Sequence, residues 1–414
     1  MKRNMLLFLL CGAFCLMAGC VKQEQAPREA PEAEVMTLYT LMSSPDCLQQ
    51  AVDAFNKQNA WNVRIEVMAD TMDNYKTQLP VSAAAGALPD IFFTWEAGFL
   101  EPLVRSGKVL PLSELPDGAA LLERFAPQTL DPLRFEGQVY AVPLTQSLTA
   151  VFYNKDVFAA AGSTVPQTWE AFLDACEKLK SCGITPLLAG SYDWQAGQML
   201  LALAAGSGGK DLTDAFAGLA PWQQEKAEQC VLLLQSLYAQ GYVQMNPGAV
   251  SVSDGTAAMT LCGDWMLSHY WNSPQIGAFL LPAVDTQYTG TCIHSVDQCY
   301  AVSADCKNRE AAAAFLELLT SEAYQRSLPE TSGQYPGTVL NMDTFENALQ
   351  EEDFRLYDQV QESVIWMDRG AGGDIGSAFN RMAMAILSGR DALQALEEFR
   401  AAVGGGTEIT NGGA

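Results

Sequence analysis

The chain has 414 residues, 49% of them hydrophobic, which suits two or three folded domains with large cores and does not suit a disordered chain. It carries 24 basic and 48 acidic residues, so its formal net charge is −24. Because binding to nucleic-acid phosphates requires basic surface patches, this charge argues against a nucleic-acid partner and favours a neutral or cationic ligand.

The first residues have the pattern of an export signal. A basic start containing Lys2 and Arg3 precedes an apolar run over residues 5–16, which is too short to cross a bilayer. The run ends in LMAGC, and the small residues before Cys20 resemble the bacterial lipoprotein box. This resemblance implies that residues 1–19 are a cleaved signal peptide and that Cys20 carries lipid. The alternative is an ordinary signal peptide that contains a cysteine.

The segment after this signal predicts a tether. Residues 20–34 are rich in Glu, Gln, Ala and Pro and show no apolar periodicity. No other apolar run in the sequence reaches the length of a membrane span. We therefore expect the protein at the extracellular face of the cell membrane, anchored there through its lipid.

The next part of the chain alternates strands with helices. A helix is expected where Leu48, Ala51, Val52 and Phe55 repeat with the spacing of one helical face. Strand, helix, strand, helix and strand in this order predict a parallel sheet covered by helices. The predicted strands of this half cover residues 35–40, 63–67, 91–93, 139–143 and 150–153.

The second half is mainly helical, with two returns to strand. One helix is expected behind residues 166–168, with an apolar stripe from Trp169 to Leu179, and another runs from 223 to 240 and stops at Gly241. Strands are predicted over 276–281 and 299–302, and further helices over 312–319, 378–387 and 392–402. The glycine-rich end, 404–414, has no core-forming residues and is expected to be loose.

Eight cysteines remain after the signal and Cys20. An even number in an exported protein permits disulfides, although their connectivity cannot be read from sequence, so we expect these cysteines to be paired or buried. The spacing of Cys292, His294, Cys299 and Cys306 does not match a structural zinc site, and we expect no metal and no cofactor.

Several segments, in a consistent order from about residue 35 to residue 402, resemble the extracellular sugar-binding lipoproteins of bacterial ABC importers, the group that includes the maltose-binding type. The segments that carry the resemblance are LPDIFFTWEAGFL (88–100), GKVLPL (107–112), GQVYAVP (137–143), VFYNKDVF (151–158), PQTWE (166–170), GTAAMTLCGDWM (255–266) and YAVSADCKNREAAAAFL (300–316).

This resemblance implies an α/β, periplasmic-binding-protein-like fold of two discontinuous lobes joined at a hinge, with the ligand in the cleft. Lobe one would comprise 35–145 plus 296–335, and lobe two 146–295 plus 336–403. It also implies hinge closure on the ligand and delivery to the ABC permease subunits in the membrane. We expect a monomer. Cys306 departs from the family, which commonly has Ser at this place.

Trp95 and Glu96 follow a short apolar strand, and ligands of open α/β sheets bind beyond the carboxyl ends of strands. An indole covers the apolar C–H face of a pyranose, and a carboxylate accepts hydroxyl protons in charge-assisted bonds. The same pairing of indole and acid recurs at Asp193–Trp194, where a polar loop is expected, at Asp264–Trp265 and around Trp366. The complete predicted ligand-binding set is Trp95, Glu96, Gln146, Asp193, Trp194, Trp222, Asp264, Trp265, Trp366, Asp368 and Arg369.

These residues also permit other interpretations. Each tryptophan can instead be a core residue beside a surface acid, and Gln146 can be a solvated hinge residue. A secreted glycosidase would need two carboxylates about 5–9.5 Å apart, for which Glu96, Asp264 and Asp368 are candidates. A polyamine-binding lipoprotein would suit the negative charge, because a cation also binds an indole face. We favour a non-catalytic protein that binds a neutral carbohydrate, with an oligosaccharide as the expected ligand.

Overall fold

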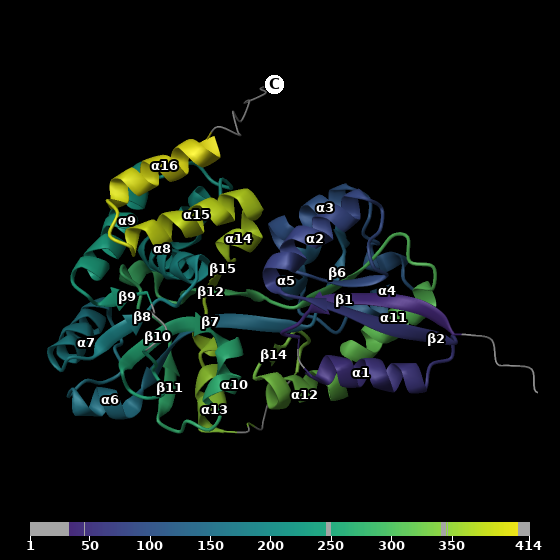
Figure 1. The fold of residues 1–414 in the computed structure, drawn as a ribbon, viewed down its shortest axis with the longest axis horizontal. Helices are drawn as coiled ribbons and strands as arrows, with labels where there is room; N and C mark the ends of the chain where they lie inside the picture. The colour runs from purple at the N-terminus through teal and green to yellow at the C-terminus, as the bar shows by residue number, and fades with distance from the viewer. Residues whose placement is uncertain (1–32, 45, 246–249, 341–344, 346, 405–414) are drawn as a thin grey trace, which may run out of the picture. The chain divides into compact units, whose positions relative to one another are not determined.

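The structure is a computed structural model that describes residues 33–44, 46–245, 250–340, 345 and 347–404 (Figure 1). The chain from Glu34 onward forms one compact unit. The predicted signal peptide, Cys20, and most of the predicted tether and tail lie outside the described residues. The first strand begins at Glu34 and the last helix ends at Gly404.

The first sheet has five strands in the order β2-β1-β3-β13-β6. Strand β1 pairs in parallel with β2 and β3, as the alternation of strands and helices predicts, whereas β13 is antiparallel to both β3 and β6. A strand from late in the sequence thus completes a sheet begun at the N-terminus. The strands are β1 (Glu34–Leu41), β2 (Val63–Asp70), β3 (Ile91–Thr94), β6 (Ala141–Pro143) and β13 (Cys299–Val302).

The second sheet has eight strands and is built around β7 (Thr145–Asn154), the long strand that directly follows β6 in the chain (Figure 1). Its first half pairs with β12 and β14, and its second half with β10 and β11. The other strands of this sheet are β8 (Thr185–Leu188), β9 (Val243–Gln244), β10 (Ala257–Gly263), β11 (Ile276–Phe279), β12 (Thr291–Val296), β14 (Tyr335–Pro336) and β15 (Glu362–Val364). A separate small ribbon pairs β4 (Arg134–Phe135) with β5 (Gln138–Val139).

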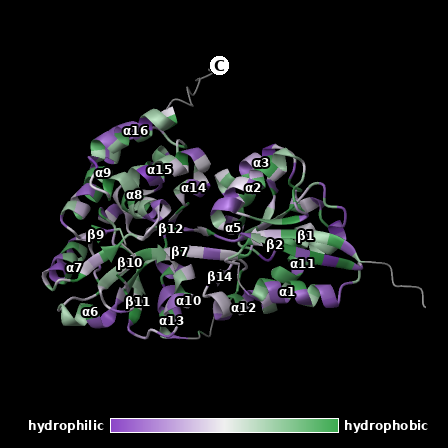
Figure 2. Ribbon diagram, in the orientation of Figure 1, coloured by the Kyte–Doolittle hydropathy of each residue, from purple (hydrophilic) through white to green (hydrophobic). Residues whose placement is uncertain are grey.

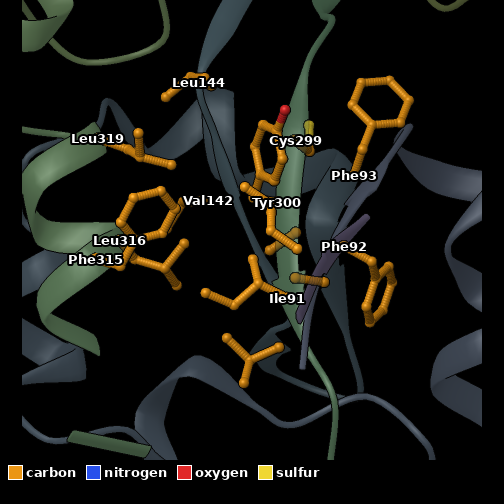
Figure 3. Packing of buried hydrophobic residues seen from close by; sticks show 14 of the residues in the cluster. Ile91, Phe92, Phe93, Val142, Leu144, Cys299, Tyr300, Phe315, Leu316 and Leu319 are labelled. Carbon is orange, nitrogen blue, oxygen red and sulfur yellow. The ribbon is translucent and has the colours of Figure 1, made fainter. Parts of the chain in front are cut away.

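Each sheet has hydrophobic cores of its own, and we call the two halves lobe one and lobe two. The core of lobe one takes its buried residues from 36–144 and 296–328, and the cores of lobe two take theirs from 148–293 and 335–399. In Figure 3, Phe315, Leu316 and Leu319 of α11 (Arg309–Leu319) lie toward Val142 and Tyr300 of the first sheet. The chain therefore changes lobes three times, although the exact lobe boundaries stay predictions.

Several helices cover the sheets with one apolar face, and in Figure 2 many of them, such as α1 (Asp46–Lys57), alternate green and purple along their length. Lobe one contains α1 (Asp46–Lys57), α2 (Met72–Ala84), α3 (Glu101–Arg105), α4 (Gly118–Leu122), α5 (Pro127–Leu130), α11 (Arg309–Leu319) and α12 (Glu322–Ser332). Lobe two contains α6 (Lys155–Ala160), α7 (Trp169–Ser181), α8 (Asp193–Phe216), α9 (Gln224–Ala239), α10 (Leu267–Tyr270), α13 (Ala348–Phe354), α14 (Met367–Gly370), α15 (Gly373–Ile386) and α16 (Ala392–Gly404).

Local sequence explains where several helices begin. The Thr168 side chain accepts a hydrogen bond from the backbone N–H of Ala171 and so caps α7, the start that residues 166–168 predict. Asp193 and Trp194, which the sequence suggested to lie in a polar loop, instead open α8. The side-chain oxygen of Gln195 accepts from the backbone N–H groups of Ser191 and Tyr192, which fixes the chain at this helix start.

Candidate functional site

Four indoles from both lobes line one cavity of about 500 Å³. Trp95 follows β3 in lobe one, at the carboxyl end of the strand, where the sequence predicts it. Trp194 lies in the first turn of α8, Trp265 in the short 3-10 turn η4 (Asp264–Met266) after β10, and Trp366 immediately before α14. Elements far apart in the sequence thus bring four predicted tryptophans to one site.

The three indoles of lobe two form a cluster. The ring centroids of Trp194 and Trp265 are 6.3 Å apart, those of Trp194 and Trp366 6.2 Å, and those of Trp265 and Trp366 5.4 Å. All three pairs are inclined rather than parallel, with interplanar angles between 40° and 60°. A ligand in the cavity therefore meets apolar faces in several orientations.

Gly263 makes room for one of these rings. A Cβ atom at Gly263 would lie 2.1–2.4 Å from three ring carbons of Trp265, a distance at which atoms overlap. The backbone at Gly263 is extended, so the glycine is needed for space and not for an unusual φ. The GDW sequence at the end of β10 therefore lets the indole lie across its own strand end.

Trp95 belongs both to the cavity and to the core of lobe one. Only 4% of its surface is exposed, and its ring packs edge-on against Phe93 and Phe99, with centroid distances of 4.7 and 4.9 Å. The Lys76 ammonium lies 5.1 Å from the centroid of the Trp95 ring, within the range of a cation–π interaction. Trp95 is therefore both a core residue of lobe one and a residue of the cavity wall.

Two ion pairs lie at the cavity. Arg369 of α14 pairs with Asp297 at 2.8 Å, and both side chains are largely buried. Lys76 of α2 pairs with Asp368 of α14 at 3.0 Å and so joins lobe one to lobe two. The predicted residues Asp368 and Arg369 therefore line the cavity with their charges already partnered.

Glu96 and Asp264 are fully buried and are not among the residues that line the cavity. Glu96 accepts a hydrogen bond from the hydroxyl of Ser295 in β12, and this bond joins lobe one to lobe two. Burial raises the pKa of Glu96 to about 8, and the positive charge of Arg369 opposes this rise. Asp264 accepts from the backbone N–H of Leu148 and from the hydroxyl of Tyr357, and burial raises its pKa well above the ordinary range. These acids hold segments together, and their direct contact with a ligand stays a prediction.

Three other predicted residues lie away from the four-indole cavity. Gln146 lines a different cavity of about 610 Å³ and donates to the backbone oxygen of Pro336 at 2.8 Å. Asp193 lines a third cavity of about 870 Å³, which shares Lys76, Trp194 and two other residues with the four-indole cavity and so adjoins it. Trp222 packs edge-on against Phe216 at 5.5 Å and carries the Arg400 guanidinium 4.8 Å from its centroid.

Sequence reasoning missed several residues of the cavity wall. Lys76 lies in α2, whose sequence has no strong apolar stripe to single it out. Asp297 and Gln298 form the short polar link between β12 and β13, and that position between two strands is a signal that was available. Gln334, next to them in space, follows α12 and has no signal in the sequence.

The eight cysteines that the structure describes form no cross-links. All eight between Cys47 and Cys306 are free thiols, and most are buried, with Cys182 exposed and Cys292 partly so. Burial raises the pKa of the Cys176 and Cys230 thiols to about 12, so they are held as unreactive thiols. Within the described residues no group of three or more His, Cys, Asp or Glu side chains is placed to hold a metal ion.

The fold and the cavity define a class of protein: two α/β lobes, three crossovers between them and an aromatic cavity that both lobes line are the architecture of a solute-binding protein. The chain belongs to the family of bacterial extracellular solute-binding proteins, which matches it over residues 43–326. None of the described helices has the length and apolar character needed to cross a membrane.

Individual relatives agree with this family. The multiple sugar-binding protein of Streptococcus mutans is 22% identical over 336 residues, which cover 77% of this chain and 78% of the relative. The galactooligosaccharide-binding protein of Bacillus subtilis is 22% identical over 355 residues, 81% of each chain. The solved structure of a chitin oligosaccharide binding protein superposes with a TM-score of 0.80 at 19% identity, over 89% of this chain and 98% of that one. The resemblance and the two-lobe fold inferred from the sequence are confirmed.

Proposed function

We propose that the protein captures a neutral sugar in the four-indole cavity and delivers it to an ABC permease, and that the sugar is an oligosaccharide. The observation that carries this proposal is the convergence of Trp95 from lobe one with Trp194, Trp265 and Trp366 from lobe two. A pyranose has apolar C–H faces that indoles cover well. Relatives named for multiple sugars and galactooligosaccharides support the same ligand class.

Capture proceeds by closure of the lobes about the three crossovers. In this proposal lobe one comprises 35–145 plus 296–335 and lobe two 146–295 plus 336–403. An open form exposes the indoles, the sugar contacts both lobes, and closure excludes water from the apolar faces. The several inclined indoles suit a ligand of more than one ring, and the adjoining 870 Å³ cavity offers space for a longer chain.

Anchoring is part of the proposal. Residues 1–19 act as a signal peptide, Cys20 receives the lipid, and the following residues tether a monomer to the outer face of the membrane. This part rests on the sequence pattern around Cys20 and on the extracellular family. Radioactive palmitate supplied to cells should label the wild-type protein and leave a Cys20→Ala variant unlabelled.

The geometry favours a neutral sugar over the two alternatives. Of the three acidic residues that line the cavity, Asp297 and Asp368 are already paired with Arg369 and Lys76, so a polyamine would have to displace these cations or bind at Asp46 alone. A glycosidase needs two carboxyl groups that face the scissile bond, and Glu96 is among the candidates that do not line the cavity. We therefore propose that the protein binds its sugar without cleaving it.

A thermal-shift screen tests the ligand class. Raffinose, maltotriose and chitotriose serve as neutral probes, and spermidine serves as the cationic probe. A ligand at 100 times its Kd should stabilise the protein by about 2.7 kcal/mol and raise its Tm by several degrees. A rise with a sugar and no release of reducing ends supports the proposal. A rise with spermidine alone, or hydrolysis of the sugar, contradicts it.

A further inference from the structure

One wall of the four-indole cavity is a chain of hydrogen-bonded side chains. It comprises Arg369, Asp297, Gln334 and Gln298, in that order, and all four line the cavity. Asp297 and Gln298 come from the link between β12 and β13, Gln334 from the segment after α12, and Arg369 from α14. The wall therefore lies where the chain crosses between the lobes. Any role of this wall in ligand selection rests on the proposed function, because the cavity is the same.

The direction of this chain of bonds is fixed by the residue at its charged end. Arg369 donates to Oδ1 of Asp297 at 2.8 Å, and the side-chain N–H of Gln334 donates to Oδ2 at 3.2 Å. An ionised carboxylate has only acceptors, so the amide of Gln334 must present its nitrogen to Asp297. The nitrogen and oxygen of an amide have nearly the same shape, so shape alone does not tell them apart. For Gln334 they are assigned from the partner, because a carboxylate can only accept.

The orientation of the Gln334 amide determines which hydrogen bonds Gln298 can make. With its nitrogen committed to Asp297, Gln334 has its oxygen Oε1 free to accept, and the side-chain N–H of Gln298 donates to it at 2.8 Å. The carbonyl oxygen Oε1 of Gln298 is the end of the chain, and among the described residues it has no hydrogen-bond partner. Gln298 is 8% exposed. A buried acceptor without a donor is costly, so it calls for an explanation.

A second unpartnered group belongs to the same cavity and has the opposite character. The indole N–H of Trp366 also has no acceptor among the described residues, and Trp366 is 4% exposed. An indole N–H can only donate. The cavity is thus lined by one residue that lacks a donor and by another that lacks an acceptor.

We propose that Gln298 is a specificity-determining residue whose carbonyl oxygen accepts a hydrogen bond from a hydroxyl of the bound ligand, while the Trp366 N–H donates to an oxygen of the same ligand. A sugar supplies both, because each hydroxyl donates and accepts. The ammonium groups of a polyamine only donate, and ether or carboxylate oxygens only accept. The wall therefore suits a ligand that carries both donors and acceptors, as a neutral sugar does, and not one that carries donors alone or acceptors alone.

Calorimetric titration tests the proposal with whichever of raffinose, maltotriose and chitotriose binds the wild-type protein most tightly. Gln298→Met keeps the length of the side chain and removes both the acceptor and the N–H that donates to Gln334, and it should raise the Kd about tenfold, equivalent to about 1.4 kcal/mol. The matched control is Gln198→Met. Gln198 is also buried with an unpartnered Oε1, but it does not line this cavity, and its replacement should leave the Kd within twofold.

Changing the ligand gives an independent measurement on the unmodified protein. Replacing each sugar hydroxyl in turn by fluorine removes the donor at that position. One such analogue should bind wild-type protein about tenfold more weakly than the parent sugar, and Gln298→Met should bind that analogue and the parent equally. Trp366→Phe, which removes the N–H and keeps a ring, should raise the Kd severalfold.

Each outcome has one meaning. If Gln298→Met binds the parent sugar like wild type, or if no fluorinated analogue loses affinity, the assignment of Gln298 is overturned while the sugar-binding function stands. If Gln298→Met fails to fold, which a lost melting transition reveals, the wild-type analogue series alone decides. If no sugar of the panel binds wild type, the proposed function itself fails. Spermidine that binds as tightly as the sugar overturns the selection argument.

Discussion

Trp265 is the residue whose place in the cavity has the clearest local cause, since Gly263 leaves the space that its ring fills. If its exposed face covers a sugar ring, Trp265→Ala should remove about 1.5–3 kcal/mol of apolar burial from the complex. We therefore expect the Kd for the best sugar of the panel to rise about tenfold to a hundredfold, measured by calorimetry.

Trp222→Ala is the matched control for this substitution. Trp222 packs against Phe216 and Arg400, away from the cavity. The control should lower the Tm, because it leaves space beside Phe216, without changing the Kd. Equal affinities of wild type and Trp265→Ala, or a loss of affinity in Trp222→Ala alone, would place the ligand elsewhere.

Glu96 makes stability depend on pH. Burial raises its pKa from 4.5 to about 8, so the folded state holds a proton that the unfolded state releases between these values. Its stabilising contribution is fully present below about pH 4.5 and is lost as the pH rises through about 8, a change on the order of 5 kcal/mol. Denaturant titrations should therefore show a steeper loss of stability from pH 5 to pH 8 in wild type than in Glu96→Gln. Parallel pH profiles would refute this origin.

Residue patterns in the sequence predicted part of the cavity, and the reason lies in chain geometry. Trp95 directly follows a buried strand and Trp265 is the second residue after one, positions that can be read from apolar runs. Their acidic neighbours Glu96 and Asp264 have the same signal, but adjacent residues point in different directions, and these two lie in the interior. Gln334 has no sequence signal because only the tertiary fold brings it beside Gln298.

At the scale of elements, α7 allows a test of whether a local sequence signal, the N-cap residue, stabilises the helix. Thr168 accepts from the backbone N–H of Ala171 at the start of this helix. Thr168→Ala should destabilise the protein by about 1 kcal/mol, as judged by denaturant unfolding, because one helix N–H loses its partner. Sugar affinity should not change, since α7 does not line the cavity. Thr168→Ser, which keeps the acceptor, should retain most of the stability, and equal losses in both variants would argue against the cap.

Elements with a strong apolar period are those that the sequence predicted well. The alternation over 63–67 and the stripe from Leu48 to Phe55 correspond to β2 and α1. The start of α8 was misread because Ser191 and its neighbours are polar residues typical of loops, whereas the side chain of Gln195 fixes them as a helix start. The pairing of strands could likewise not be predicted from local sequence. No residue pattern in β13 indicates that this strand pairs antiparallel with β3.

At the scale of the whole described unit, each lobe is stabilised by its own hydrophobic core, and further contacts join the two lobes. Each lobe buries its own hydrophobic residues, so each can move as a body. Polar contacts also join the lobes, among them Lys76 with Asp368 and Ser295 with Glu96. We therefore expect a sugar that contacts both lobes to shift the equilibrium between open and closed forms towards the closed form.

Gly98 tests this dependence. It lies in the turn η1 (Ala97–Phe99) of lobe one, where a Cβ would come within 2.6 Å of the backbone nitrogen of Gly372 and 2.9 Å of the backbone oxygens of Arg369 and Gly370 in lobe two. Backbone atoms cannot rotate away, so Gly98→Ala should hold the lobes apart. We expect the Kd for the best sugar of the panel to rise at least about tenfold, because an incompletely closed cavity leaves the indoles partly in water.

Small-angle scattering measures the same effect directly. Wild type should show a smaller radius of gyration with sugar than without it, and Gly98→Ala should remain nearly as expanded with sugar as without. Gly373→Ala is the matched control, because a Cβ there meets no atom within 4 Å. It should close and bind like wild type. If Gly98→Ala closes fully, the turn η1 can shift enough to accommodate a Cβ atom. Closure then does not depend on the close approach of Gly98 to the backbone of lobe two.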